Sequence, residues 1–133
     1  MSQITNIVRT LLALGLGLAM CVGVSGCKQG TTKPSEFVRV TNADISQYLG
    51  KKLSLNGNHL IMAEDGTFAG MWNGGSLGGT WEMKDDYWCR VLTEFYQADR
   101  LNQEDCQLLE SSGALLRGTR NKGSGQSFVY QVE

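Results

Sequence analysis

The chain has 133 residues, of which 41% are hydrophobic, with 12 basic and 13 acidic side chains, four cysteines and one histidine. A chain of this length forms one ordinary domain, and its near-neutral charge argues against nucleic-acid binding, which needs a basic excess. A single histidine excludes most zinc sites and most histidine-based catalysis. We therefore expect no metal, no cofactor and no nucleic-acid partner.

The first 26 residues differ in composition from the rest of the chain. Arg9 is their only charged residue, and it precedes an apolar stretch from Leu11 to Val24. A charged start, an apolar centre of about 7–15 residues and an exit of small residues are typical of a secretory signal. A buried core helix is the alternative, but the glycines of this stretch and its lack of a polar face disfavour it. We predict a signal peptide at 1–26.

The signal ends in Val24-Ser25-Gly26-Cys27, which resembles the lipobox of bacterial lipoproteins at all four positions. The resemblance implies that Cys27 carries diacylglycerol on its sulfur, usually with a further acyl chain on its amino group. Several acyl chains anchor a protein stably in a membrane. The residue after Cys27 is Lys28 and not an aspartate, which resembles lipoproteins forwarded to the outer membrane. We therefore expect a lipid-anchored envelope protein that faces the periplasm.

Residues 27–36 are predicted to consist of the lipidated cysteine and a polar tether. Residues 28–36 include the only proline and no aliphatic or aromatic side chain, so they cannot form part of a core. We expect the folded domain to cover residues 37–133. Near its start, Thr41 and Asp44 have the spacing of a capping box, and Gly50 stands where a helix would stop. One short helix is predicted between them.

The remainder of the domain is predicted to be strand. Two-residue turn signals begin at Asn56, Asp65, Gly74, Asp85 and Ser112, at the spacing of an antiparallel meander. We expect an all-β fold, most simply an up-and-down barrel of about eight strands, with a two-sheet sandwich as the alternative. The predicted strands are Lys51–Leu55, Asn58–Glu64, Thr67–Asn73, Ser76–Lys84, Tyr87–Phe95, Glu104–Ser111, Ala114–Thr119 and Ser127–Val132.

The cysteines divide into three kinds. Cys21 leaves with the signal peptide and Cys27 takes the lipid, so Cys89 and Cys106 are the only pair left for an oxidising compartment. We predict a disulfide between them. It would contribute about 3 kcal/mol by constraining the unfolded chain. A redox-active dithiol is the rival interpretation, but no C-x-x-C motif supports it.

The chain offers few catalytic candidates. His59 stands alone on a predicted strand, and the acidic pairs at 64–65, 85–86 and 104–105 are adjacent residues whose side chains would point to opposite faces of a strand. Residues 118–125 (GTRNKGSG) lack the Lys-Ser/Thr ending of a phosphate loop. We predict no catalytic residue, and an enzyme would require a cleft that gathers His59, Asp85 and Asp86.

Large aromatic residues alternate with glycines on two neighbouring predicted strands. Phe68, Gly70 and Trp72 share one face of the first strand, and Gly79 and Trp81 share one face of the next. The pattern indicates either tapered packing in a small barrel or room for an apolar ligand between the rings. On the second interpretation Phe68, Trp72 and Trp81 would bind the ligand.

Trp88 and Arg90 flank Cys89 and lie on the opposite face of the strand from it. An aromatic ring beside a guanidinium group is typical of protein–protein contact sites, so the two side chains predict an exposed patch that binds a partner. A cation–π clasp that closes one end of the barrel is an equal alternative.

Five segments of the domain carry a resemblance to a known family, namely FVRVTNADISQYLGKKL, DGTFAG, GGTWEMKDDYWCR, DCQLLE and LLRGTRNKGSG. They resemble a family of small exported alphaproteobacterial proteins of unassigned function, and the Trp-Cys-Arg and Asp-Cys-Gln tripeptides are the most specific part. The resemblance supports the expected fold and location without implying an activity. The Gly-x-Trp segments at 70–72 and 79–81 also resemble, more distantly, the small lipocalin-like and avidin-like barrels.

These features predict a lipid-anchored lipoprotein of the cell envelope that acts as a non-catalytic binding module for an apolar small ligand or a peptide. The alternative is a structural or assembly lipoprotein that docks a larger envelope protein. An enzyme of unknown class is the third expectation.

Overall fold

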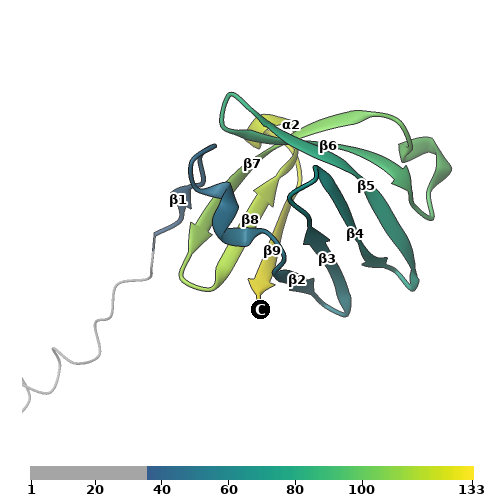
Figure 1. Cartoon of the computed structure of the whole chain (residues 1–133), viewed down its shortest axis with the longest axis horizontal. Helices are drawn as coiled ribbons and strands as arrows, with labels where there is room; N and C mark the ends of the chain where they lie inside the picture. Colours follow the sequence, from purple (N-terminus) through teal and green to yellow (C-terminus); the bar gives the residue numbers. More distant parts are fainter. Residues whose placement is uncertain (1–35) are drawn as a thin grey trace, which may run out of the picture. The chain divides into compact units, whose positions relative to one another are not determined.

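Nine antiparallel strands form one sheet in the computed structural model, which describes residues 36–133 (Figure 1). The predicted signal peptide, Cys27 and almost all of the tether lie outside these residues. The strands are β1 (Val38–Arg39), β2 (Lys52–Leu55), β3 (Asn58–Met62), β4 (Thr67–Trp72), β5 (Gly75–Lys84), β6 (Tyr87–Glu94), β7 (Glu104–Ser112), β8 (Leu115–Thr119) and β9 (Ser127–Val132).

The strands from β2 to β9 close into a barrel. Each of them pairs with the next in sequence, and β9 pairs back with β2, where Leu53 lies opposite Val132. Strand β1 is an additional short strand beside β7. The predicted eight-stranded up-and-down barrel is therefore confirmed, and the two-sheet sandwich is wrong. Closure satisfies the backbone hydrogen bonds that an open sheet would expose at its edges.

Tight turns form where the sequence predicted them. Asn56 and Asp85 have φ of 48° and 51°, and the residues after them also have positive φ, as mirror-image two-residue hairpin turns require. Two turns are displaced by one residue from the prediction. Asn73 and Gly74 connect β4 to β5, and Gly113 begins the turn between β7 and β8.

The predicted helix is a single 3₁₀ turn, η3 (Ile45–Tyr48). The Asp44 carboxylate accepts hydrogen bonds from the backbone N–H and the hydroxyl of Thr41 at 2.9 and 2.7 Å, so the capping-box spacing does produce a local contact. Val40 and Ile45 are buried in the hydrophobic core. The segment before β2 therefore covers one end of the barrel interior.

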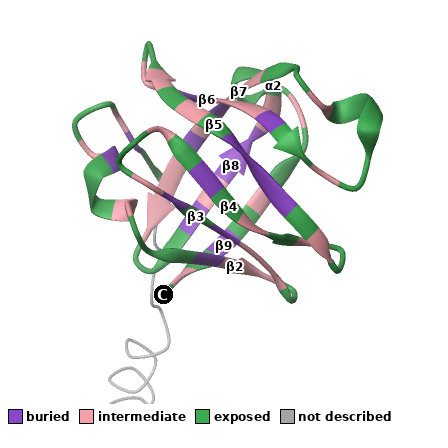
Figure 2. Ribbon diagram, turned by 45° about the vertical axis from the view of Figure 1, so that its right-hand side comes forward, coloured by how far each residue is buried: buried purple, intermediate pink, exposed green. Residues whose placement is uncertain are grey.

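We call the end of the barrel interior that the segment before β2 covers the closed end, and it is filled with aliphatic side chains. Met62 and Leu116 are among the most deeply buried residues, at 2% and 1% exposed, and a residual void of only about 10 Å³ remains near them. Figure 2 shows how buried and exposed residues alternate along the strands. This alternation follows from the two-residue period of a β-strand, which sends one face inward and the other to solvent.

Close backbone packing explains the glycines beside the aromatic rings. A Cβ atom on Gly70 would collide with the carbonyl group of His59, and a Cβ atom on Gly79 would lie 2.8 Å from the ring of Phe68 and collide with the carbonyl oxygen of Val91. Both glycines are therefore required where neighbouring strands approach closely, as the packing interpretation predicts.

The predicted disulfide joins β6 to β7. Cys89 and Cys106 are direct cross-strand partners with Cα atoms 3.9 Å apart, and their sulfur atoms are bonded. The connection that they bracket carries a second 3₁₀ turn, η4 (Ala98–Arg100). The disulfide therefore clamps the base of the longest loop of the barrel, as its position in the sequence indicates.

Candidate functional site

A cavity of about 430 Å³ lies within the end of the barrel opposite the closed end. We call this the open end, because its rim is formed by solvent-exposed loop residues such as Tyr96 and Arg100. A volume of this size falls within the range of small-molecule sites, which is about 300–1,000 Å³. The open end is thus the part of the described chain best shaped to hold a ligand.

One wall of the cavity is apolar and consists of inward-facing side chains from β3, β4, β5, β6 and β9. The Trp72 ring meets Phe128 edge-on at 5.8 Å between centroids and lies 6.4 Å from the Tyr130 ring. Such contacts hold aromatic rings in fixed positions. The side chains of this wall are Leu60, Trp72, Leu77, Leu92 and Phe128.

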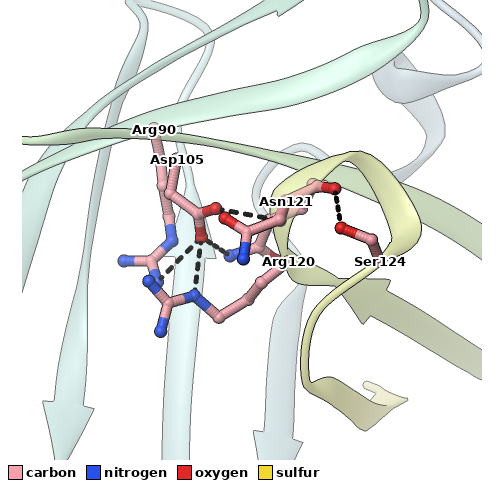
Figure 3. A network of polar contacts seen from close by, with 6 residues as sticks. Arg90, Asp105, Arg120, Asn121 and Ser124 are labelled. Atoms are coloured by element: carbon pink, nitrogen blue, oxygen red, sulfur yellow. Dashed lines mark hydrogen bonds and ion pairs between the residues drawn. The ribbon is translucent and has the colours of Figure 1, made fainter.

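The facing wall is polar and is built around the Asp105 carboxylate at the start of β7 (Figure 3). One of its oxygens accepts hydrogen bonds from Arg120 Nε at 3.0 Å and Gln107 Nε2 at 2.9 Å. The Arg90 guanidinium lies 3.7 Å from the same oxygen. Two positively charged side chains thus share one carboxylate inside the barrel mouth.

A left-handed turn of the backbone completes this wall. The segment α2 (Arg120–Gly123) contains Asn121 and Lys122 at φ of 51° and 54°, so it is one irregular turn instead of a regular helix. Its geometry directs the backbone N–H of Asn121 to the second Asp105 oxygen at 3.2 Å. The segment that lacks a phosphate-loop motif therefore binds an anion of its own chain through one backbone N–H and the Arg120 side chain.

The pKa values of three groups that line the cavity differ from their usual values. Burial would raise the pKa of Asp105, but hydrogen bonds from Gln107 and Asn121, together with Arg120, outweigh it and hold that pKa below its usual value. Burial also lowers the pKa of Arg90, against the opposing effect of Asp105. Burial raises the pKa of Tyr130 to about 12. At neutral pH the lining therefore carries an ionised carboxylate, charged guanidinium groups and a protonated phenol.

The loop between β6 and β7 forms the rim. Phe95, Tyr96, Gln97, Arg100 and Gln103 from this loop line the cavity. The loop is tied to the barrel by hydrogen bonds from Asn73 to the Tyr96 hydroxyl at 2.9 Å and from the Asn102 backbone N–H to the Leu92 carbonyl at 2.8 Å. The rim therefore has a defined shape that joins the apolar and polar walls.

The structure separates the three predicted ligand-binding residues. Trp72 lines the cavity, whereas Phe68 is 3% exposed and packs against Trp88 in the core. Trp81 also faces inward but does not line the cavity, because its indole N–H bonds the carbonyls of Ala63 and Thr67 at 3.2 and 2.9 Å. Phe68 and Trp81 thus support the barrel, and Trp72 is the only one of the three at the candidate site.

The predicted exposed patch at Trp88 and Arg90 is wrong. The two residues do share a face of β6 opposite Cys89, but that face points into the barrel, so Trp88 is 4% exposed and the Arg90 side chain 17% exposed. The clasp is not formed either, since the cation–π contacts of residues 36–133 involve Arg39, Arg117 and Lys122. Both residues instead line the cavity.

The predicted catalytic candidates lie elsewhere. His59 is on the outer face of β3, since it shares that face with the exposed Ile61 while Leu60 and Met62 are buried. The Asp86 carboxylate accepts a hydrogen bond from the Asn42 backbone at 2.7 Å, which fastens the N-terminal segment. Arg39 donates to the carbonyls of Asp85 and Asp86 at 3.3 and 3.1 Å. The cavity lining includes none of His59, Asp85 and Asp86, so the expected condition for catalysis is not met at this site.

Metal binding has little support in the described residues. Cys89, Glu104 and Cys106 are the one group of potential ligand atoms close enough to hold an ion there, and both sulfur atoms are bonded to each other. A disulfide sulfur is not a thiolate ligand. The group is therefore a structural cross-link beside a surface carboxylate.

The sequence pattern placed Asp105 only in one of the acidic pairs, and no pattern singled out Arg120. A signal for Asp105 was present, since it alternates with Gln107 and Leu109, which places all three on the inner face of β7. For Arg120 no such signal exists, because its position depends on the left-handed turn at Asn121.

Within residues 36–133, no helix is both long enough and apolar enough to cross a membrane. No protein-family model matches the chain, and no curated protein or solved structure is significantly similar to it. The candidate site is therefore interpreted from its own geometry and chemistry.

Proposed function

We propose that the protein is a non-catalytic binding module whose barrel holds a small ligand with an apolar part. The observation that carries this proposal is the cavity of about 430 Å³ at the open end, with Trp72 and Leu92 on its apolar wall. Ligand sites are typically concave pockets in which apolar side chains lie beside converging polar groups, and the lining of this cavity contains both kinds. A docking role was expected to use an exposed Trp88 and Arg90, and their burial leaves ligand binding as the better-supported function.

Native mass spectrometry of the full chain, purified from the cells that make it, tests the proposal. We expect a population heavier than the bare protein, with the extra mass lost as a small molecule on activation. A Leu77→Phe variant should reduce that population because it fills the cavity, while the control Ile61→Phe, on the exposed outer face of β3, should leave it unchanged. A bare mass only, with no response of tryptophan fluorescence to extracted lipids, would contradict ligand binding.

We propose also that the protein is exported and anchored by lipid on Cys27, with the barrel facing the periplasm. The support comes from the lipobox and the preceding apolar stretch of the sequence. A Cys27→Ser variant should move the protein from the membrane fraction to the soluble fraction or leave it unprocessed. The matched control is Cys21→Ser, which should be processed and stay with the membranes. Release of both variants, or a Cys27→Ser protein that is processed and still stays with the membranes, would contradict the assignment of Cys27.

A further inference from the structure

The mouth of the cavity carries more positive than negative charge. Arg90, Arg100 and Arg120 line the cavity, and the carboxylates that line it belong to Glu104 and Asp105. Glu104 is already bound on its other side by Lys84, at 2.7 Å between Nζ and a carboxylate oxygen. Asp105 is therefore the one lining carboxylate left to compensate three guanidinium groups.

The guanidinium groups have hydrogen-bonding capacity to spare. Each has five N–H donors, and Arg120 uses Nε for Asp105. The Arg90 side chain is 17% exposed, and its closest approach to Asp105, at 3.7 Å, is an ion pair too long to be a hydrogen bond. Burial with so little compensation lowers the pKa of Arg90. A second acceptor at this position would stabilise its charge.

A buried neutral donor points in the same direction. Trp88 is 4% exposed and lines the cavity, yet its Nε1 has no hydrogen-bond partner within residues 36–133. Tyr130, which also lines the cavity, keeps its hydroxyl proton at neutral pH because its pKa is about 12. Such groups are normally paired when buried. The lining thus contains guanidinium and indole donors that Asp105 alone does not satisfy, and an oxyanion, which only accepts, is the complementary chemistry.

We propose that the cavity binds a single-chain amphiphile with an anionic head group, the head lying between Arg90 and Arg120 and the apolar chain against Trp72 and Leu92. This inference rests on the proposed ligand-binding function and names the class of ligand. It commits to an oxyanion head, whether carboxylate, phosphate or sulfate. The lining offers both guanidinium groups and apolar side chains, so the proposed ligand has one part for each.

The first experiment varies the head group on one constant chain. The full chain is used as cells produce it, held in lipid nanodiscs where it is membrane-bound, and titrated with decanoate, decanol and decyltrimethylammonium while tryptophan fluorescence is recorded. We expect decanoate to bind about tenfold or more tighter than decanol, and the cation not to bind, because a charge-assisted hydrogen bond distinguishes them. Decyl phosphate and decyl sulfate then identify which oxyanion fits best.

The second experiment varies the protein. Arg90→Met should lower the affinity for decanoate about tenfold and leave that for decanol unchanged, whereas Asp105→Asn should raise it severalfold by removing the competing carboxylate. The control is Arg117→Met, because Arg117 stacks on Phe37 at 4.1 Å and pairs with Glu110 outside the cavity lining. Circular dichroism establishes that each variant is folded, and the increase in Asp105→Asn cannot result from misfolding.

The outcomes separate the two proposals. Preference for decanoate that is lost in Arg90→Met and strengthened in Asp105→Asn supports the anionic head group. Equal binding of decanoate and decanol would overturn this inference and leave the barrel as a binder of apolar ligands. If none of the five compounds binds and the purified protein carries no small molecule, the proposed function itself fails.

Discussion

The two ends of the barrel interior are formed by the same strands but have opposite chemistry. At the closed end, Met62 and Leu116 are almost completely buried and the remaining void is about 10 Å³. At the open end, the interior holds a cavity of about 430 Å³ with Arg90, Asp105 and Arg120 on one wall. The contrast indicates that the closed end supplies most of the stability of the domain, and that the open end gives up packing around the candidate site.

Position along a single strand decides which chemistry a residue serves. On β7, Asp105 and Gln107 face the cavity and Leu109, farther along the same face, is 3% exposed in the core. On β6, Cys89 lies between Trp88 and Arg90 and faces outward, and its disulfide with Cys106 holds this strand to β7. The same inner face therefore changes from core to candidate site over about two residues, or ~7 Å.

Equal truncations at the two ends should have unequal costs, and this is the largest effect we predict. Leu116→Ala should lower the free energy of unfolding by about 3–5 kcal/mol, because it leaves a cavity that tightly packed neighbours cannot fill. Leu92→Ala should cost about 2 kcal/mol or less, since Leu92 already borders empty space. Urea denaturation of both variants measures the difference.

Ligand binding should reverse the order of these two variants. Leu92→Ala is expected to weaken binding of an apolar chain, whereas Leu116→Ala, while folded, is expected to bind as the unsubstituted protein does. Equal losses of stability, or weaker binding in Leu116→Ala alone, would show that the two ends are not separate in function.

Removing the disulfide should affect the open end first. A double Cys89→Ala, Cys106→Ala variant should lose about 3 kcal/mol of stability, because the unfolded chain regains the entropy of a loop that spans 17 residues. Amide hydrogen exchange should rise in β6, β7 and their connecting loop, and much less around Met62 and Leu116. Uniform acceleration across the barrel would instead mean that the two ends unfold as one unit.

Much of the barrel could be predicted because its signals are local. Turn residues such as Asn56 and Asp85 require positive φ, and alternation on each strand then fixes which side chains share a face. The cysteine pair followed from elimination and is present. What alternation does not fix is which face is inside, and for Trp88 and Arg90 the choice of the outer face was wrong.

The candidate site was less predictable because it depends on contacts between distant segments. Asp105 is an ordinary acidic residue until the backbone at Asn121 turns left-handed and brings Arg120 to it. The sequence between β8 and β9 contains no motif that requires this turn. Trp72 was predicted from the alternation of aromatic residues with glycines, and it lines the cavity because it stands at the end of β4.

Changing the charge at the open end should produce a smaller loss of stability that depends on pH. Asp105→Asn should cost about 1–3 kcal/mol at neutral pH, because Arg90 and Arg120 lose their shared carboxylate. The folded-state pKa of Asp105 is lowered, so its contribution is fully present above the unfolded pKa of about 3.9 and is lost as the pH falls through the folded value. The difference in stability between Asp105→Asn and the unsubstituted protein should therefore be constant from about pH 7 to 5 and shrink below about pH 4.

The cost of Leu116→Ala should not follow this course, because that substitution removes no ionisable group. If both costs changed in parallel with pH, the charge at the open end would not account for the effect.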